Sequence, residues 1–309
     1  METDQALDDW NSPGKRAYKV LGRYRSARRA HDAGLAVLAA GRPYWVYPEN
    51  QEFVLVVSAR EAEWLASEVA ILAAGNHSRP SDGPQGPPLK PVSRMPAIAV
   101  VVFPALIFIW QSTTSKLTES GLNSSVSVLE QGEWWRLFTA VTLHGDLGHL
   151  LGNSIALPIF GYLGSRYLGS GLAWLTILLL AALANFTNVL LAGEEEFRSL
   201  GASTAVFAAL GLLAGVPTGW YLRSRKPVCR REWGVPLVGG CILFFWLGGG
   251  DYPTDIGGHL WAFLFGILAA IPLAYFLVGQ RLGSRWQNFI LAFTGMVLGG
   301  SWFLAFTGF

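Results

Sequence analysis

Apolar residues gather in long runs in the part of the chain that begins at Met95. A helix rises about 1.5 Å per residue, so a run of about 20 apolar residues is long enough to cross the hydrocarbon core of a bilayer. The pattern predicts seven membrane-spanning helices, at residues 95–111, 147–167, 171–192, 201–220, 233–249, 255–278 and 286–309.

The first 76 residues carry shorter patterns, which predict a small α+β domain. We expect a helix over residues 26–40 that ends at Gly41, and a second helix over residues 59–73. Between them, two strands at 44–47 and 52–57 are joined by a turn at Pro48-Glu49-Asn50. No catalytic constellation occurs in this domain, so we expect a regulatory or oligomerisation role; a second activity is the alternative.

Residues 77–94 separate the two regions and are rich in Pro, Gly and Ser, which predicts a flexible tether. Lysine and arginine gather in alternate loops between the predicted spans, and such loops face the cytoplasm. We therefore expect a cytoplasmic N-terminus, an external C-terminus and an external segment at 112–146. The residues that give this bias are Lys90, Arg94, Arg166, Arg223, Arg225, Lys226, Arg230, Arg231, Arg281 and Arg285.

The composition agrees with an integral membrane protein that carries a soluble piece, since 51% of the residues are hydrophobic and only 14% are charged. The net charge of +2 gives no indication of nucleic-acid binding, and we expect none. The two cysteines, Cys229 and Cys241, lie in places where we do not expect them to meet. The acidic N-terminus lacks the basic-then-apolar pattern of a cleaved signal peptide, so we expect it in the mature protein.

Three short polar patches interrupt the apolar runs: residues 144–153 (HGDLGHLLGN), residues 201–204 (GAST) and His259. Polar groups in hydrocarbon are costly without partners and mark functional sites. With the predicted topology, the second, fourth and sixth spans all run inward from the outer face. The three patches then lie at a common depth, about 3 to 10 Å below the outer helix ends.

The chemistry of the patches is complementary. His149 and Asn153 are four residues apart, so they share a helix face and can supply N–H donors to a developing oxyanion. Ser203 lies among small residues that leave its hydroxyl accessible. His259 is followed by Ala262 and Gly266, a spacing that favours close packing against another small-residue helix. The sequence thus predicts a nucleophile beside a base, as acyl transfer requires.

These motifs resemble the rhomboid intramembrane serine proteases. The resemblance lies in His-x4-His-x3-Asn at the second span, Gly-x-Ser at the fourth, the histidine of the sixth, and Trp135-Arg136 in the external segment. It implies an all-α polytopic fold, in which residues 95–278 form a rhomboid-like six-span core and residues 279–309 add a seventh helix. It covers about residues 95–278.

The resemblance also implies roles for individual residues. Ser203 is expected to be the nucleophile and His259 the general base of a dyad, with no cofactor and no metal. His149, Asn153 and the backbone N–H of Ser203 are expected to bind the oxyanion. The remaining positions are structural: His144, which braces the loop, Gly201, Phe207 beside the imidazole, and Trp135 and Arg136, which anchor the loop at the headgroup level.

Two positions depart from the family pattern. The usual Gly-x-Ser-Gly reads Gly-Ala-Ser-Thr, and the small residue three positions after His259 is Ala262 rather than Gly. Because Thr204 is β-branched, we expect these changes to widen the spacing between the fourth and sixth spans slightly, which would affect catalytic efficiency.

Other interpretations remain open on the sequence alone. Asp255, one turn before His259, is a candidate third member of a triad, and three histidines at one depth suggest zinc, although no HExxH motif occurs. The favoured function is a serine protease that cleaves transmembrane segments of membrane-protein substrates near the outer face of a bacterial plasma membrane. The rivals are an inactive rhomboid-like protein that binds membrane clients, and a transporter.

Overall fold

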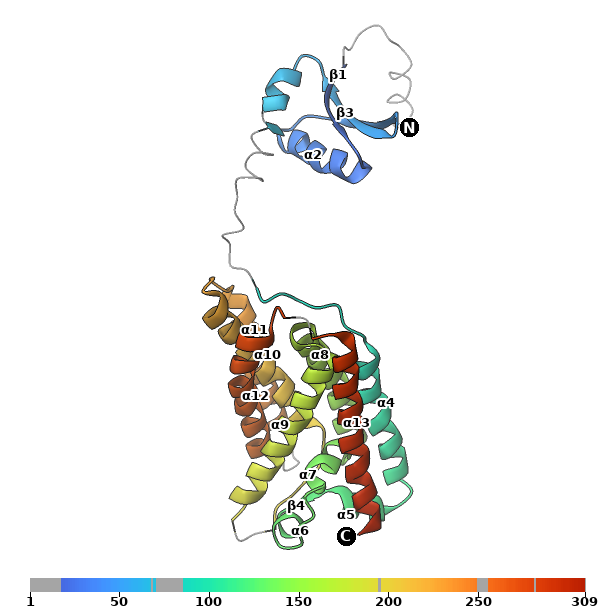
Figure 1. Cartoon of the computed structure of the whole chain (residues 1–309), viewed down its shortest axis with the longest axis vertical. Helices are drawn as coiled ribbons and strands as arrows, with labels where there is room; N and C mark the ends of the chain where they lie inside the picture. Colours follow the sequence, from blue (N-terminus) through green and yellow to red (C-terminus); the bar gives the residue numbers. More distant parts are fainter. Residues whose placement is uncertain are drawn as a thin grey trace. The chain divides into compact units, whose positions relative to one another are not determined.

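The structure is a computed structural model that describes residues 18–67, 69–70, 86–193, 196–248, 255–280 and 282–308. Contacts divide the chain into two compact units, Met1–Asp82 and Gly83–Phe309 (Figure 1). This division falls inside the segment predicted to be a linker. Residues 77–85 of that segment lie outside the described residues.

The N-terminal unit is an antiparallel three-stranded sheet with one helix against it. The strand order is β1-β3-β2, and the core contains Val37, Val57, Ala62 and Leu65. The helix begins at Ser26, whose hydroxyl accepts a hydrogen bond from the backbone N–H of Arg29. The elements are β1 (Tyr18–Tyr24), α2 (Ala27–Ala39), β2 (Trp45–Glu49) and β3 (Glu52–Ser58); residues 62–67 are also helical.

Two features of this unit differ from the prediction. Strand β1 was not predicted, because its residues are mostly exposed and show no clean alternation of apolar and polar positions. The expected turn at Pro48-Glu49-Asn50 is also displaced, since β2 includes Pro48 and Glu49. The chain instead turns at Asn50 and Gln51, which have φ values of 48° and 65°. Of the predicted helix at 59–73, residues 71–73 lie outside the described part.

The second unit is built from long helices that overlap each predicted apolar run. Four described helices, α9, α10, α12 and α13, are both long and apolar enough to cross a membrane, and α4 is apolar but shorter. Helices α8 and α11 are long but carry more polar residues. The bounds are α4 (Met95–Gln111), α8 (Leu147–Leu168), α9 (Ser170–Leu191), α10 (Ser203–Ser224), α11 (Arg230–Gly248), α12 (Ile256–Leu277) and α13 (Ser284–Thr307).

Short elements fill the segment between α4 and α8, which the sequence predicted only as an external polar segment. They gather at the end of the helical unit where the C-terminus lies (Figure 1). Asn123 pairs with Ser199 in a two-stranded ladder, so this segment is joined to the chain just before α10. The elements are α5 (Ser115–Gly121), β4 (Asn123–Ser124), α6 (Ser125–Leu129), α7 (Arg136–Thr139), η1 (Ala140–Thr142) and β5 (Arg198–Ser199).

Part of the predicted tether is fixed to the helical unit. The backbone N–H of Lys90 donates to the carbonyl of Arg166 at 2.6 Å, and Arg166 Nε donates back to the carbonyl of Lys90 at 2.8 Å. The backbone of Lys90 is therefore held at the end of α8.

Helix α10 is the centre of the unit, because every residue from Ser203 to Pro217 is buried. It meets α12 along a row of glycines that allows the two backbones to approach closely. A Cβ placed on Gly211 would lie 2.2 Å from the carbonyl oxygen of Phe263, and one on Gly215 would lie 2.4 Å from that of Ile267. Only glycine fits at these positions, so the helix spacing is fixed by backbone contact.

This packing leads to a prediction about stability. Gly215→Ala would push a methyl group into the backbone of α12, so we expect a loss of about 2 to 3 kcal/mol despite the better helix propensity of alanine. The matched control is Gly239→Ala in α11, where a Cβ would meet no atom within 4 Å. Thermal unfolding of the purified protein in detergent measures both. Equal stability of the two variants would contradict the proposed packing.

Candidate active site

Ser203 and His259 face each other across the α10–α12 interface. The Ser203 Oγ lies 2.7 Å from the His259 Nε2, which is hydrogen-bond distance. Ser203 is the first residue of α10, and His259 lies in the first turn of α12, so the tight helix packing below them aligns both side chains. Their exposed fractions are 8% and 4%. The pair is thus a buried hydroxyl beside an imidazole nitrogen.

Phe207 fixes the plane of the imidazole. Its ring is stacked on His259 with 4.6 Å between centroids and 21° between planes. Phe207 lies one turn after Ser203 on the same helix face, so the serine and the aromatic ring approach the histidine together. The edge of Phe244 from α11 packs against Phe207, with 5.9 Å between centroids. The histidine is therefore oriented by ring packing.

Gly201 brings His149 close to the start of α10. A Cβ on Gly201 would lie 2.3 Å from the His149 Cε1, and the φ of Gly201 is +130°. No other residue fits both the space and the backbone conformation. The backbone N–H of Gly201 donates to the carbonyl of Ala140 at 2.9 Å, which ties this turn to the loop segment. Asp146 caps α8 by accepting the backbone N–H of His149 at 2.8 Å.

Asn153 and His144 form a second buried pair. The Asn153 Nδ2 lies 3.1 Å from the His144 Nε2. The backbone of His144 is held by Gln111, whose side chain accepts its N–H at 3.1 Å and donates to its carbonyl at 3.3 Å. One N–H of the Asn153 amide is therefore engaged, and the second N–H remains to serve another acceptor.

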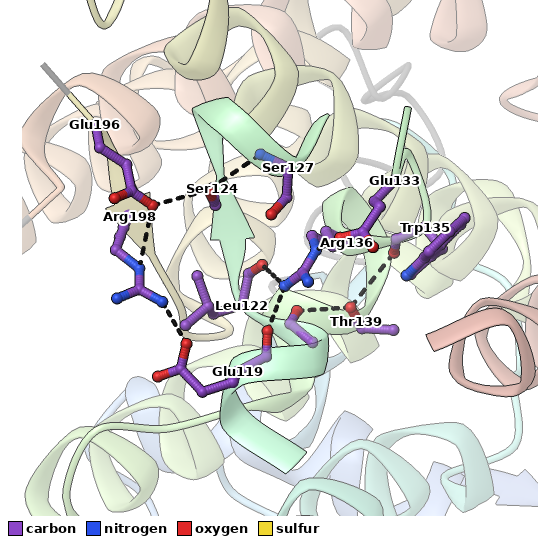
Figure 2. A network of polar contacts seen from close by, with 11 residues as sticks. Glu119, Leu122, Ser124, Ser127, Glu133, Trp135, Arg136, Thr139, Glu196 and Arg198 are labelled. Carbon is purple, nitrogen blue, oxygen red and sulfur yellow. Dashed lines mark hydrogen bonds and ion pairs between the residues drawn. The ribbon is translucent and has the colours of Figure 1, made fainter. Parts of the chain in front are cut away.

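Arg136 organises the loop segment from within, as Figure 2 shows. Its Nη1 donates to the carbonyls of Glu119 at 2.6 Å and Leu122 at 3.0 Å, and its Nε pairs with Glu133. Thr139 adds a hydrogen bond to the carbonyl of Gly121 at 2.6 Å. The guanidinium thus collects backbone carbonyls that two turns would otherwise leave unpaired.

Trp135 and Arg136 were expected to anchor the loop through lipid headgroups, but both side chains are buried in protein. Trp135 is 4% exposed and Arg136 is 8% exposed. Both lie inside the loop segment, where the Nη1 and Nε groups of Arg136 bond to loop groups rather than to lipid phosphates. At the surface of the same region, Arg198 bridges Glu119 and Glu196 (Figure 2).

Asp255 has a different role from the third triad member considered above. Its carboxylate accepts the backbone N–H of Gly258 at 2.8 Å and the side-chain amide of Asn188, and it caps the first turn of α12. It therefore stabilises the helix end that carries His259.

The predicted widening at Thr204 and Ala262 is not observed at the site, since the Ser203–His259 distance is that of a normal hydrogen bond. Both residues are buried, at 3% and 0% exposure. The Thr204 Oγ1 has no hydrogen-bond partner within the described part of the chain. The zinc alternative also finds no support, because the described residues contain no group of three or more histidine, cysteine or acidic side chains able to hold a metal ion.

Two supporting residues were not predicted from the sequence. Gln111 was assigned only as the last residue of an apolar run, and Asn188 only as part of another. Both are polar amides at the ends of long helices, and both hold residues next to the site. Their position at a helix end, beside a loop with unpaired backbone groups, is the signal that points to such a role.

One family model covers the part of the chain that contains Ser203 and His259. A family model described as the Rhomboid domain matches residues 131–276. This range contains Trp135, Arg136, both members of the Ser203–His259 pair, and the residues around them.

Several curated proteins are similar over the same region. Rhomboid protease GluP of Bacillus subtilis is 30% identical over 168 residues, which cover 53% of this chain and 31% of that protein. RHOMBOID-like protein 4 of Arabidopsis thaliana is 32% identical over 178 residues, with 56% and 43% covered, and RHOMBOID-like protein 5 is 27% identical over 165 residues, with 50% of each covered. The chain thus spans half or less of the length of these relatives. Residues 131–276 of this integral membrane protein thus match the Rhomboid domain, and the same region is similar to rhomboid proteases.

Proposed function

We propose that the protein is an intramembrane serine protease that cleaves transmembrane segments of other membrane proteins near the outer face of the bilayer. The observation that carries the proposal is the 2.7 Å contact between the Ser203 Oγ and the His259 Nε2, inside a rhomboid domain. A buried serine hydroxyl with its hydrogen bond directed to an imidazole is the arrangement of an activated nucleophile.

In this mechanism the His259 Nε2 takes the hydroxyl proton while the Ser203 Oγ attacks the scissile carbonyl carbon. The tetrahedral intermediate then collapses, the C–N bond breaks, and His259 returns the proton to the leaving amine. A water molecule, deprotonated by the same imidazole, attacks the acyl-enzyme and releases the new carboxylate. Phe207 keeps the imidazole plane fixed through both proton transfers.

Three groups are the proposed donors to the developing oxyanion. Ser203 is the first residue of α10, so its backbone N–H has no partner within the helix. His149 packs on Gly201 just before this helix begins, and Asn153 has one N–H left after its contact with His144. Donors fixed by packing before the reaction stabilise the charged intermediate without reorganisation.

The substrate must supply an extended segment, because a peptide bond within a regular helix is shielded from attack. We therefore expect Gly, Ala or Ser near the cut and helix-weakening residues close by. The proposed setting is a bacterial plasma membrane, with a cytoplasmic N-terminus and the site open to the external side. Two alternative functions are the binding of membrane-protein clients without cleavage, and transport. The first test below addresses both.

The dyad is tested by cleavage of a model single-span substrate in vesicles. We expect Ser203→Ala and His259→Ala each to lower kcat by at least about a thousandfold, because the nucleophile and the base act as one unit. Ser165→Ala is the matched control, since Ser165 is equally buried but donates to the carbonyl of Gly161 within α8. Cleavage that persists in either dyad variant would refute the assignment.

The position of His149 is tested through Gly201→Ala. The added methyl would displace the imidazole, and a displacement of about 1 Å at an oxyanion donor costs about a hundredfold in rate. We expect the loss in kcat with little change in KM. Gly132→Ala is the control, because Gly132 also has a positive φ, +73°, but a Cβ there would meet no atom within 4 Å. Equal rates for the two variants would remove His149 from the mechanism.

The neutral form of His144 is tested through the pH dependence of stability. Burial, and then the nearby His149, lowers the pKa of His144, in the turn before α8, from 6.5 to about 4. Below pH 6.5 the unfolded chain therefore binds a proton at His144 that the folded protein does not bind. The free energy of unfolding thus decreases as the pH falls from about 6.5 to about 4. We expect His144→Gln to flatten the stability curve in this window relative to the unsubstituted protein. Parallel curves would contradict the assignment.

A further inference from the structure

The helical unit contains a cavity of about 530 Å³ on the side of α10 that faces α4 and α13. Its lining is almost entirely apolar. The inner wall is formed by buried residues of α9 and α10, among them Trp174, Ile177 and Ala205. Ala205 is two residues from Ser203, so the cavity reaches the back of the helix that begins the candidate active site.

The mouth of the cavity opens between α4 and α13. Met95 and Phe103 of α4 line it and are 70% and 37% exposed. On the opposite side the lining includes Gly295 and Gly299 of α13, where a Cβ would meet no atom within 4 Å. These two glycines are therefore not required for helix contact, and their lack of side chains keeps the space open.

Helix α13 is held at both ends, which prevents it from closing the cavity. At its start, Gln287 donates to the carbonyl of Leu168 at 3.1 Å and accepts the backbone N–H of Leu172 at 3.1 Å. Near its other end, Trp302 Nε1 donates to Thr142 Oγ1 at 3.1 Å. Phe306 also packs on Trp110 of α4, with 5.4 Å between ring centroids. The gap between α4 and α13 is thus maintained by contacts at both ends of α13.

The lining selects for hydrocarbon. Its two hydroxyls are already used, since Thr142 donates to the carbonyl of Thr139 at 2.7 Å and Thr294 donates to that of Ile290 at 2.8 Å. Water would find few partners there. A substrate helix is too large, because ten residues of a helix about 10 Å wide and about 15 Å long fill roughly 1,200 Å³. A single acyl chain is the apolar molecule that the membrane supplies at the mouth.

Basic residues surround the end of the unit where the mouth begins. Arg94 immediately precedes Met95 and is exposed, and its guanidinium has no hydrogen-bond or ion-pair partner among the residues that the structure describes. Lys90 and Arg166 lie at the same end, where the backbone N–H of Lys90 donates to the carbonyl of Arg166 and the Arg166 Nε donates to the carbonyl of Lys90. Gln287 joins the start of α13 to the end of α8 there. Such a cluster attracts anionic lipid headgroups.

We propose that this cavity is a phospholipid site, in which one acyl chain of an anionic phospholipid lies between α4 and α13 and its phosphate pairs with Arg94. The acyl chain would pack against the face of α10 that lines the cavity, where α13 leaves a gap. The proposal is independent of proteolysis, and its test needs no substrate.

The test uses the full chain in vesicles of phosphatidylcholine with a small fraction of phosphatidylglycerol that carries a photoreactive diazirine on one acyl chain. Bulk lipid cannot reach the buried inner wall, so we expect cross-links on the peptide that contains Trp174 and Ile177. In Gly295→Leu/Gly299→Leu, leucine side chains fill the cavity, so this label falls by at least about tenfold. The control is Gly300→Leu, whose Cβ also meets open space but which does not line the cavity, and it keeps the label.

The headgroup is tested with a second pair of variants. We expect Arg94→Gln to lower inner-wall labelling by phosphatidylglycerol about threefold, because one phosphate contact is lost, while Arg230→Gln at the start of α11 leaves it unchanged. The lipid site is overturned if the inner wall carries no label in the unsubstituted protein, or if the label persists in the double leucine variant. Equal labelling by diazirine phosphatidylcholine or by a diazirine fatty acid overturns the assignment of an anionic phospholipid.

Discussion

The close contact between α10 and α12 is the constraint on which the candidate site depends. Gly211, Gly215 and Gly219 place the backbone of α10 directly on carbonyls of α12, so the distance between the two helices is set by atoms that cannot change rotamer. Ser203 and His259 lie at the start of these helices, so the helix spacing also sets the distance between their side chains. A dyad needs positional accuracy of a fraction of an ångström, and backbone contact supplies it more reliably than long side chains.

The polar groups around the site are organised in two connected sets. One set joins Gln111, His144 and Asn153 beneath the loop segment. The other centres on Arg136, which satisfies backbone carbonyls of the same segment. The first set links α4 and its loop to α8, and the second holds the turns of the loop segment together, so both support the surroundings of the candidate site. Buried polar networks of this kind favour one conformation of the loop.

The sequence predicts the parts of this structure that follow from local patterns. Apolar runs locate the long helices, and the cost of polar groups in hydrocarbon points to Ser203, His259 and His149. The burial of Arg136 was not predicted, because its partners Glu119 and Leu122 are not its neighbours in sequence and the preference of arginine for headgroups is only an average. The short helices between α4 and α8 have no periodic pattern, and β1 is too exposed to show one. Tertiary contacts decide such elements.

The pairing of β4 with β5 has a consequence for the order in which the protein folds. Asn123 pairs with Ser199, and its side chain also donates to the carbonyl of Asn185. Asn185 lies within α9 and Ser199 follows it, so the loop segment cannot complete these hydrogen bonds before α8 and α9 have been synthesised. Contacts of such long sequence separation form late. Trp302, which bonds Thr142 from the last helix, extends this delay to the end of the chain. The loop segment between α4 and α8 therefore completes its hydrogen bonds only after α10 and α12, which carry Ser203 and His259, have been synthesised.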